Sequence, residues 1–171
     1  MKSDTKRILS FVFVVGVATW ILRNRVAVAD GCRVVGLWDR QRALSELIRP
    51  AEVAWVPRAL GGIAFADQVG AWMRRRFQYK PDKPTRDVWC SPEVTLTRGG
   101  GDCDDLAIVG CSVLRAAGFE AVVRTGTMDQ GRGPVGHAWV EGCDHNGWFL
   151  LEATSGSVHR CHRPSGYEVL T

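Results

Sequence analysis

The chain has 171 residues, of which 46% are hydrophobic and 23% charged, the composition of an ordinary globular protein with room for one domain. A formal net charge of +4 is too small to indicate a nucleic-acid partner, and we expect none. Arg74, Arg75 and Arg76 form the densest basic run, which we interpret as the solvated face of a helix.

The N-terminus combines a basic head with an apolar run from Ile8 to Leu22. Fifteen helical residues span roughly 22 Å, which is shorter than a bilayer core but typical of the apolar part of a signal peptide. Ala27-Val28-Ala29 supplies a small-x-small cleavage pattern. Arg23 and Arg25 instead suit a short anchor whose long basic side chains reach the membrane surface.

Residues 1–29 are therefore predicted to be a signal peptide or a membrane anchor, and residues 30–171 the functional domain. The protein should be exported or membrane-anchored, with residues 8–22 in contact with the membrane if they are not cleaved. A lipoprotein site at Gly31-Cys32 and a buried helix in a soluble protein are the weaker alternatives.

Helical spacing of apolar residues predicts helices over 36–49, 63–78 and 104–117. A further short helix is indicated by Ser91-Pro92-Glu93, a capping residue followed by a proline at the first helical position. It should end at Arg98, because three glycines follow. The helix over 104–117 is expected to be the central one.

After Gly118 the hydrophobic period changes from helical spacing to two, which predicts strands. The expected strands cover 120–127, 136–141, 147–153 and a short last segment, 167–170. Helices followed by an antiparallel sheet indicate an α+β domain.

Cys103 is the candidate nucleophile, because a glycine-rich loop leads into it and it begins the central helix. The unpaired N–H groups of a helix N-terminus favour an anion and therefore the thiolate. Asp102 is placed to cap this helix, with Asp105 as the acidic partner of a capping box. These two acids and Asp104 would oppose a thiolate unless they are turned away, paired or bound to a cation.

His137 and Glu152 are predicted to face each other across two neighbouring strands. If Glu141 pairs with Trp148 around the turn at Asn146-Gly147, His137 lies directly opposite Glu152. A carboxylate there can accept a hydrogen bond from one imidazole nitrogen and leave the other nitrogen for the sulfur.

Six cysteines leave the disulfide pattern open, since one is set aside as the nucleophile. Cys143–Cys161 and Cys32–Cys90 are candidate pairs. A zinc site is a competing interpretation, although its spacing is poor, and it would draw on the C-terminal cluster of Cys143, His145, His159, Cys161 and His162.

Four blocks together resemble the bacterial transglutaminase-like cysteine protease type of the transglutaminase-like superfamily. The resemblance extends over about residues 60–156. The blocks are Asp87-Val88-Trp89-Cys90-Ser91-Pro92-Glu93-Val94-Thr95-Leu96, Gly101-Asp102-Cys103-Asp104-Asp105-Leu106-Ala107, Gly136-His137-Ala138-Trp139-Val140 and Leu151-Glu152-Ala153-Thr154.

The resemblance implies a papain-like core, with N-terminal helices and the nucleophile helix packed on an antiparallel sheet. It implies a triad of Cys103, His137 and Glu152, where the family usually has aspartate at the last position. It also implies that calcium could bind through Asp102 and Asp104. The indole of Trp89 is a candidate oxyanion donor, with packing as the alternative.

The expected activity is thiol-dependent acyl transfer on a protein or peptide amide, with no cofactor needed for the chemistry. A cysteine peptidase is the first choice. Protein-glutamine transglutaminase activity and a membrane-tethered, non-catalytic interaction domain are the alternatives.

Overall fold

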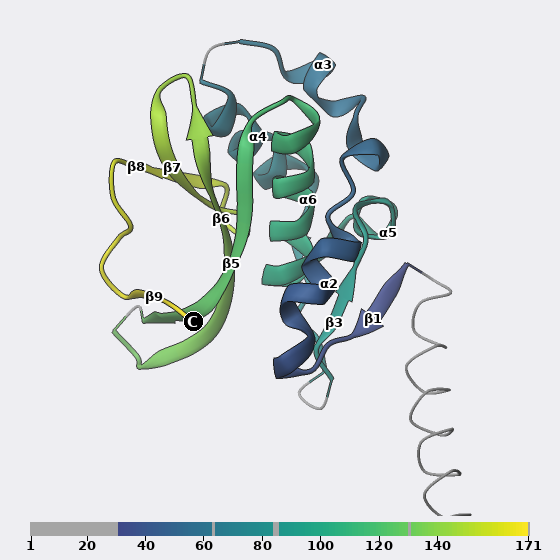
Figure 1. Cartoon of the computed structure of the whole chain (residues 1–171), viewed down its shortest axis with the longest axis vertical. Coiled ribbons are helices and arrows are strands. Elements are labelled where there is room, and N and C mark those ends of the chain that lie inside the picture. Colours follow the sequence, from purple (N-terminus) through teal and green to yellow (C-terminus); the bar gives the residue numbers. More distant parts are fainter. Residues whose placement is uncertain (1–30, 63, 84–85, 130, 171) are drawn as a thin grey trace, which may run out of the picture.

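The computed structural model describes residues 31–62, 64–83, 86–129 and 131–170. Helices form one layer and a five-stranded antiparallel sheet forms the other, which confirms the α+β class (Figure 1). In chain order the elements are β1 (Cys32–Val34), η1 (Leu37–Asp39), α2 (Arg40–Leu47), η2 (Pro50–Val53), α3 (Val56–Leu60), α4 (Phe65–Arg76), β2 (Gln78–Tyr79), β3 (Val88–Cys90), α5 (Pro92–Arg98), β4 (Gly100–Gly101), α6 (Cys103–Ala116), β5 (Glu120–Asp129), β6 (Pro134–Asp144), β7 (Gly147–Glu152), β8 (Ser157–Arg160) and β9 (Tyr167–Val169).

The central helix α6 is buried along almost its whole length, from Asp104 to Leu114. Its apolar side chains share one core with Ala138 and Val140 of β6 and with Leu151 of β7. The sequence predicted a single buried stripe, but a helix that other elements cover on several sides needs apolar residues all round. Figure 1 shows α6 between the sheet and the other helices.

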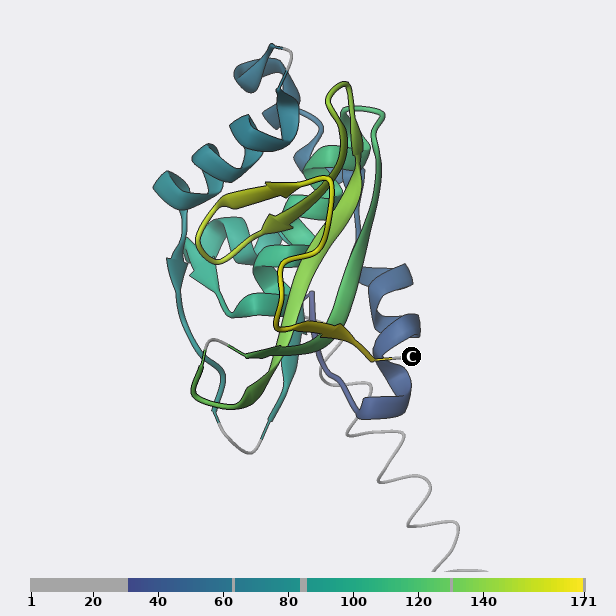
Figure 2. The ribbon, with the colours of Figure 1, turned by 90° about the vertical axis from the view of Figure 1, so that its left-hand side faces the viewer.

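The predicted helices and strands are present with ends shifted by a few residues, and β8 and the short strands β1 to β4 were not predicted. The large sheet has the order β8-β7-β6-β5-β9, so the last strand returns to pair with the first one. Figure 2 shows the C-terminal segment, in yellow, lying across the sheet face that is turned away from α6.

The β6–β7 hairpin differs by two residues from the predicted register. Glu141 pairs with Leu150 and not with Trp148. Because side chains alternate with a period of two, a two-residue shift leaves each of them on its predicted face. His137 and Glu152 therefore still share a face, but they lie diagonally and not directly opposite each other.

A disulfide links Cys32 to Cys90 and joins β1 to β3 at directly paired positions, which confirms one of the two candidate pairs. The Cys143–Cys161 pair is wrong. Cys143 pairs with Trp148 on one side, and the Cys161 N–H donates to the Trp148 carbonyl from the other side. The two cysteines thus lie two strands apart, roughly 10 Å, whereas a disulfide needs a Cα separation below about 7 Å.

We expect loss of the Cys32–Cys90 disulfide to lower the free energy of unfolding by about 2–4 kcal/mol, because the bond closes a loop with a sequence separation of 58. Urea unfolding of a Cys32→Ala/Cys90→Ala variant measures this loss. Cys143→Ala/Cys161→Ala is the matched control, since both of those cysteines are free and exposed. Equal losses in the two double variants would contradict the prediction.

Candidate active site

Cys103 is the first residue of α6, and a pair of short parallel strands holds it in place. The sequence indicated a flexible glycine loop before it, but Gly100 and Gly101 are buried and paired with β2. A Cβ atom at Gly100 would lie 2.0 Å from the carbonyl oxygen of Gln78. Glycine is therefore needed here because two backbones approach closely, and the approach fixes where the thiol lies.

A cleft of about 340 Å³ lies over Cys103. The start of α6 contributes Asp102, Cys103 and Asp104, and β6 contributes Gly136, His137 and Ala138. The rest of the lining comes from the segment between Tyr79 and Trp89, from Arg40 at the start of α2, and from Thr125 of β5. The predicted nucleophile and the predicted base thus line one cavity.

Glu152 is the centre of a hydrogen-bond network on the sheet. Its Oε2 accepts from His137 Nε2 at 2.6 Å and from the Tyr167 hydroxyl at 2.8 Å. Its Oε1 accepts from the Thr154 hydroxyl at 2.7 Å and from the Thr154 N–H at 3.2 Å. The predicted contact between His137 and Glu152 is therefore present, and both side chains are more than nine-tenths buried.

The diagonal placement suits a glutamate. Diagonal neighbours on adjacent strands lie about 7–8 Å apart, further than directly opposed ones. The additional methylene of Glu152, relative to aspartate, helps its carboxylate to reach His137 across this distance. Glu152 stands where the family usually has aspartate, and this difference is consistent with the observed strand register.

The environment of Glu152 keeps it ionised. Burial alone would raise the pKa of Glu152, but the hydrogen bond and electrostatic interaction with His137, together with the hydroxyls of Thr154 and Tyr167, hold that pKa below its ordinary value. Burial and the neighbouring carboxylate raise the pKa of Tyr167, so its hydroxyl remains a donor at neutral pH.

Tyr167 was not predicted as a site residue. It lies on β9, and its ring packs edge-on against Trp139 at 5.2 Å and against His137 at 6.1 Å. The short strand itself was expected, but the pairing of β9 with β5 joins segments about 40 residues apart, and no local pattern indicates it.

Cys103 lies close to Ala138, the residue that follows His137 on β6. The backbone N–H groups of Ala138 and Asp104 approach the sulfur, which favours the thiolate. No hydrogen bond joins the sulfur to His137 in the described part of the chain. The Glu152 bond uses Nε2 of His137, so Nδ1 is the nitrogen left for the thiol, and such contacts are often long without substrate.

The helix N-terminus does not lower the pKa of the Cys103 thiol below its ordinary value. Burial, followed by the charges of Asp104 and Asp102, raises the pKa of the thiol to about 12. The predicted conflict between the thiolate and its acidic neighbours is therefore consistent with the arrangement of this site.

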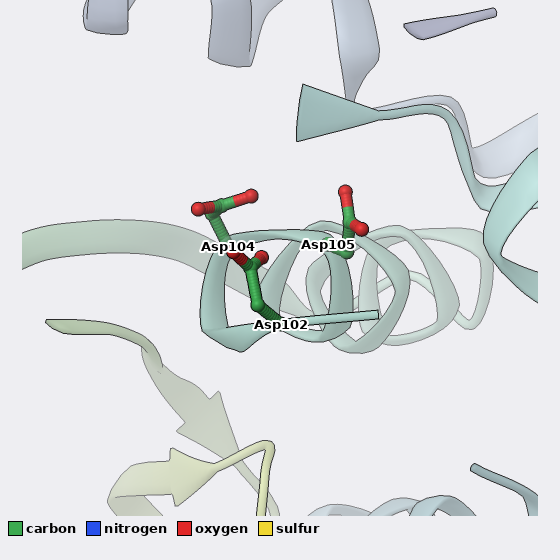
Figure 3. A group of neighbouring side chains, drawn as sticks. All are labelled: Asp102, Asp104 and Asp105. Atoms are coloured by element: carbon green, nitrogen blue, oxygen red, sulfur yellow. The ribbon is translucent and has the colours of Figure 1, made fainter. Parts of the chain in front are cut away.

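The three aspartates at the start of α6 are all buried, with exposed fractions between 5% and 8%. Figure 3 shows them around the first turn of the helix, and one oxygen of each lies within 4.8 Å of the others. Burial and the charges of Asp102 and Asp105 raise the pKa of Asp104 to about 11. Burial raises the pKa of Asp105 to about 7.

The expected capping box is not formed. Asp102 occupies the N-cap position but makes no side-chain capping bond, and Oδ1 of Asp105 accepts from the N–H of Cys90 at 2.7 Å. Oδ1 of Asp102 and Oδ1 of Asp104 are buried without any hydrogen-bond partner. Oxygen atoms in this state match the ligands that calcium prefers, so the residues fit a hard cation.

Trp89 lines the cleft and is 1% exposed, but its indole N–H donates to Asp87 Oδ1 at 2.6 Å. An oxyanion role would require this bond to be given up, so that role stays a prediction. The zinc interpretation gains no support. Among the residues described, only Asp102, Asp104 and Asp105 bring three metal-ligating side chains together.

The sequence profile of the transglutaminase-like superfamily matches residues 56–153, more than half of the chain. The chain belongs to this superfamily. The matched region begins at α3 and ends just after Glu152, so it contains the cleft residues of α6 and β6 but neither Tyr167 nor the β1 half of the disulfide.

Curated relatives of this superfamily member include Centrosomal protein of 76 kDa from Mus musculus, which is 36% identical over 84 residues, and its Homo sapiens counterpart, 39% identical over 80 residues. Each alignment covers 47% of this chain and 12% of the relative. The chain thus spans a small part of the length of these proteins.

Solved structures with a similar arrangement include a proposed cysteine protease from Cytophaga hutchinsonii, with 22% identity, 65% of this chain and 37% of that chain covered, and a TM-score of 0.48. The periplasmic domain of TgpA from Pseudomonas aeruginosa has 24% identity, 71% and 46% coverage, and a TM-score of 0.40.

No helix within residues 31–62, 64–83, 86–129 and 131–170 is long and apolar enough to cross a bilayer. The apolar run over 8–22 and the cleavage pattern at 27–29 lie outside the described residues.

We expect Tyr167→Phe to lower stability by about 1–2 kcal/mol, because a hydrogen bond to a buried carboxylate is lost while the ring contact with Trp139 is kept. Tyr79→Phe is the matched control: Tyr79 lines the same cleft, is 56% exposed and is the only other tyrosine in the sequence. Urea unfolding of both variants measures the difference. Equal midpoints would show that the Tyr167 hydroxyl contributes nothing.

Proposed function

We propose that this protein is a thiol-dependent acyl-transfer enzyme that acts on protein or peptide amides, with Cys103 as nucleophile, His137 as base and Glu152 as the group that orients the base. The observation that supports the proposal best is the shared cleft of Cys103 and His137, with His137 bound to an ionised Glu152. Membership of the transglutaminase-like superfamily is consistent with it.

In the proposed reaction His137 Nδ1 takes the proton of the Cys103 thiol, and the sulfur attacks the carbonyl carbon of the amide. A C–S bond forms, the imidazolium gives its proton to the amide nitrogen, and the C–N bond breaks to release an amine. Water then attacks the thioester as His137 accepts its proton. The C–S bond breaks, a carboxylic acid leaves and the thiol is restored.

Glu152 acts through His137. Its ionised carboxylate holds Nε2 of the ring and stabilises the positive charge that the ring carries in both steps. The backbone N–H of Cys103, at the start of α6, is suited to hold the oxyanion. A side-chain donor from Trp89 would add to it only after Trp89 releases Asp87.

We expect rapid alkylation of Cys103 to depend on His137. Cys143 and Cys161 are exposed and would also react, so the parent for this test carries Cys143→Ser and Cys161→Ser. That parent keeps Cys103 and the buried Cys111 as its only free thiols.

Labelling of this parent by iodoacetamide should be lost in Cys103→Ala and slowed by about 100-fold or more in His137→Ala, because a positioned base contributes roughly 100- to 10,000-fold. Peptide mass mapping identifies the labelled residue. Cys111→Ala should label at the parent rate. An unchanged rate in His137→Ala would contradict the assigned base and favour the non-catalytic interaction domain.

Hydrolysis is proposed ahead of transamidation, which shares the first half of the reaction and differs only in the acceptor. Incubating a glutamine-containing peptide with the protein separates them. Release of free acid or ammonia without incorporation of a labelled primary amine supports a hydrolase, whereas incorporation of the amine supports a transglutaminase.

We further propose that Asp102 and Asp104 bind calcium, with Asp105 as a third neighbouring carboxylate. The buried and unpartnered Oδ1 atoms of Asp102 and Asp104 support this proposal. A bound dication would supply positive charge beside Cys103, whose thiol pKa is raised by burial and by the neighbouring Asp104 and Asp102.

Calcium should move the pH midpoint of Cys103 alkylation to lower pH. The sign follows because burial and then the charges of Asp104 and Asp102 raise the thiol pKa, and a bound cation opposes the part that comes from the two aspartates. Calcium should also raise the melting temperature of the protein, and Asp102→Asn should weaken both effects. Identical alkylation profiles with calcium and with chelator would exclude the cation at this site.

We propose an exported or membrane-anchored location, on the strength of the apolar run over 8–22 behind a basic head. The Cys32–Cys90 disulfide supports this proposal, because disulfides persist mainly in oxidising compartments.

A further inference from the structure

The turn η1 exposes two large apolar side chains that take no part in the core. Trp38 is 94% exposed and Leu37 is 62% exposed, and no residue of this turn is buried. Val34, at the end of β1, adds a third apolar side chain with 44% exposure. We name Val34, Leu37 and Trp38 the η1 corner.

The η1 corner follows closely on the apolar run of the N-terminus. Residues 23–36, fourteen in number, separate Leu22 from Leu37 and could span up to roughly 50 Å when extended. A membrane that holds residues 8–22 would therefore lie within reach of Trp38. Tryptophan is enriched where proteins meet the headgroup region of a bilayer, because its ring is apolar and its N–H remains hydrated.

We propose that the η1 corner docks on the lipid surface, with Trp38 inserted at the headgroup boundary. Docking adds a second contact to the anchor and fixes how the domain is oriented on the membrane.

The orientation has a functional consequence that rests on the proposed function. Arg40 follows η1 as the first residue of α2 and lines the cleft that contains Cys103. A residue that lines the cleft is therefore only two positions along the chain from Trp38. The amides that this cleft reaches are then those of substrate segments close to the membrane surface.

Quenching by brominated phospholipids tests the contact directly. The chain of residues 1–171 is reconstituted in phosphatidylcholine vesicles with and without bromine on the acyl chains, and tryptophan emission is compared. Trp38→Phe is the test variant. Trp55→Phe is the matched control, because Trp55 is 57% exposed and directly precedes α3, at the opposite end of the molecule from the start of α2 (Figure 1).

The parent should show a bromine-quenched component that falls in Trp38→Phe by close to one tryptophan's share of the seven. Trp55→Phe should retain the full component. Equal quenched components in the parent and Trp38→Phe overturn the proposal, whether Trp38 is then in water, against a second copy or against the N-terminal residues.

Alkylation of Cys103 in the same vesicles separates this proposal from the proposed function. An unchanged alkylation rate in Trp38→Phe shows that the variant is folded. If the parent shows the Trp38 quenching but no His137-dependent alkylation, the proposed lipid contact is supported and the proposed enzymatic function is contradicted.

Discussion

The carboxylate of Glu152 is the interaction on which this site depends. Its two oxygens accept four hydrogen bonds, from His137, from Tyr167 and twice from Thr154, and these bonds join β6, β7 and β9. A buried carboxylate with fewer donors would hold a proton and could not orient the imidazole. The network therefore sets both the position of the base and its electrostatic state.

The nucleophile is held by a different kind of constraint, which is steric. Gly100 allows β4 to approach β2 closely, Gly101 leaves room for the Asp105 side chain, and α6 begins at Cys103 immediately after Asp102. Asp102 and Asp104 flank Cys103 in the sequence. Burial of the thiol and then the charges of these two residues raise the thiol pKa. The two halves of the site are thus opposite in character. The carboxylate that orients the base is satisfied by donors, whereas the thiol is surrounded by groups that disfavour its charge.

Sequence reasoning located most of what depends on local chemistry. The helix after Ser91 begins and ends where the capping residue and the glycines predicted, and the cleft contains Cys103 and His137. Side-chain alternation fixes which face each residue of the hairpin occupies, but it does not distinguish registers that differ by two residues, and the turn signal at Asn146-Gly147 did not fix the register either. His137 and Glu152 are still in contact because a glutamate can reach a diagonal neighbour.

The parts that sequence reasoning missed depend on pairing between distant segments. Tyr167 reaches Glu152 only because β9 pairs with β5, and Asp105 leaves the expected capping box because the N–H of Cys90 lies beside it. Gly100 and Gly101 suggested a flexible loop since a glycine pattern does not distinguish freedom from close packing. The choice between the two cysteine pairs likewise required the strand order.

The disulfide connects β1 to the acidic cluster as well as stabilising the fold. Cys32 lies at the start of the described chain, and its covalent bond to Cys90 leads through one backbone hydrogen bond to Asp105, at the edge of the acidic cluster. The strand pairing of β1 with β3 adds to this connection, with backbone hydrogen bonds from Ser91 to Gly31 and from Val35 to Asp87 at its two ends. The position of β1 and the position of the Asp105 carboxylate are therefore linked through β3, so a change in either one would be passed to the other.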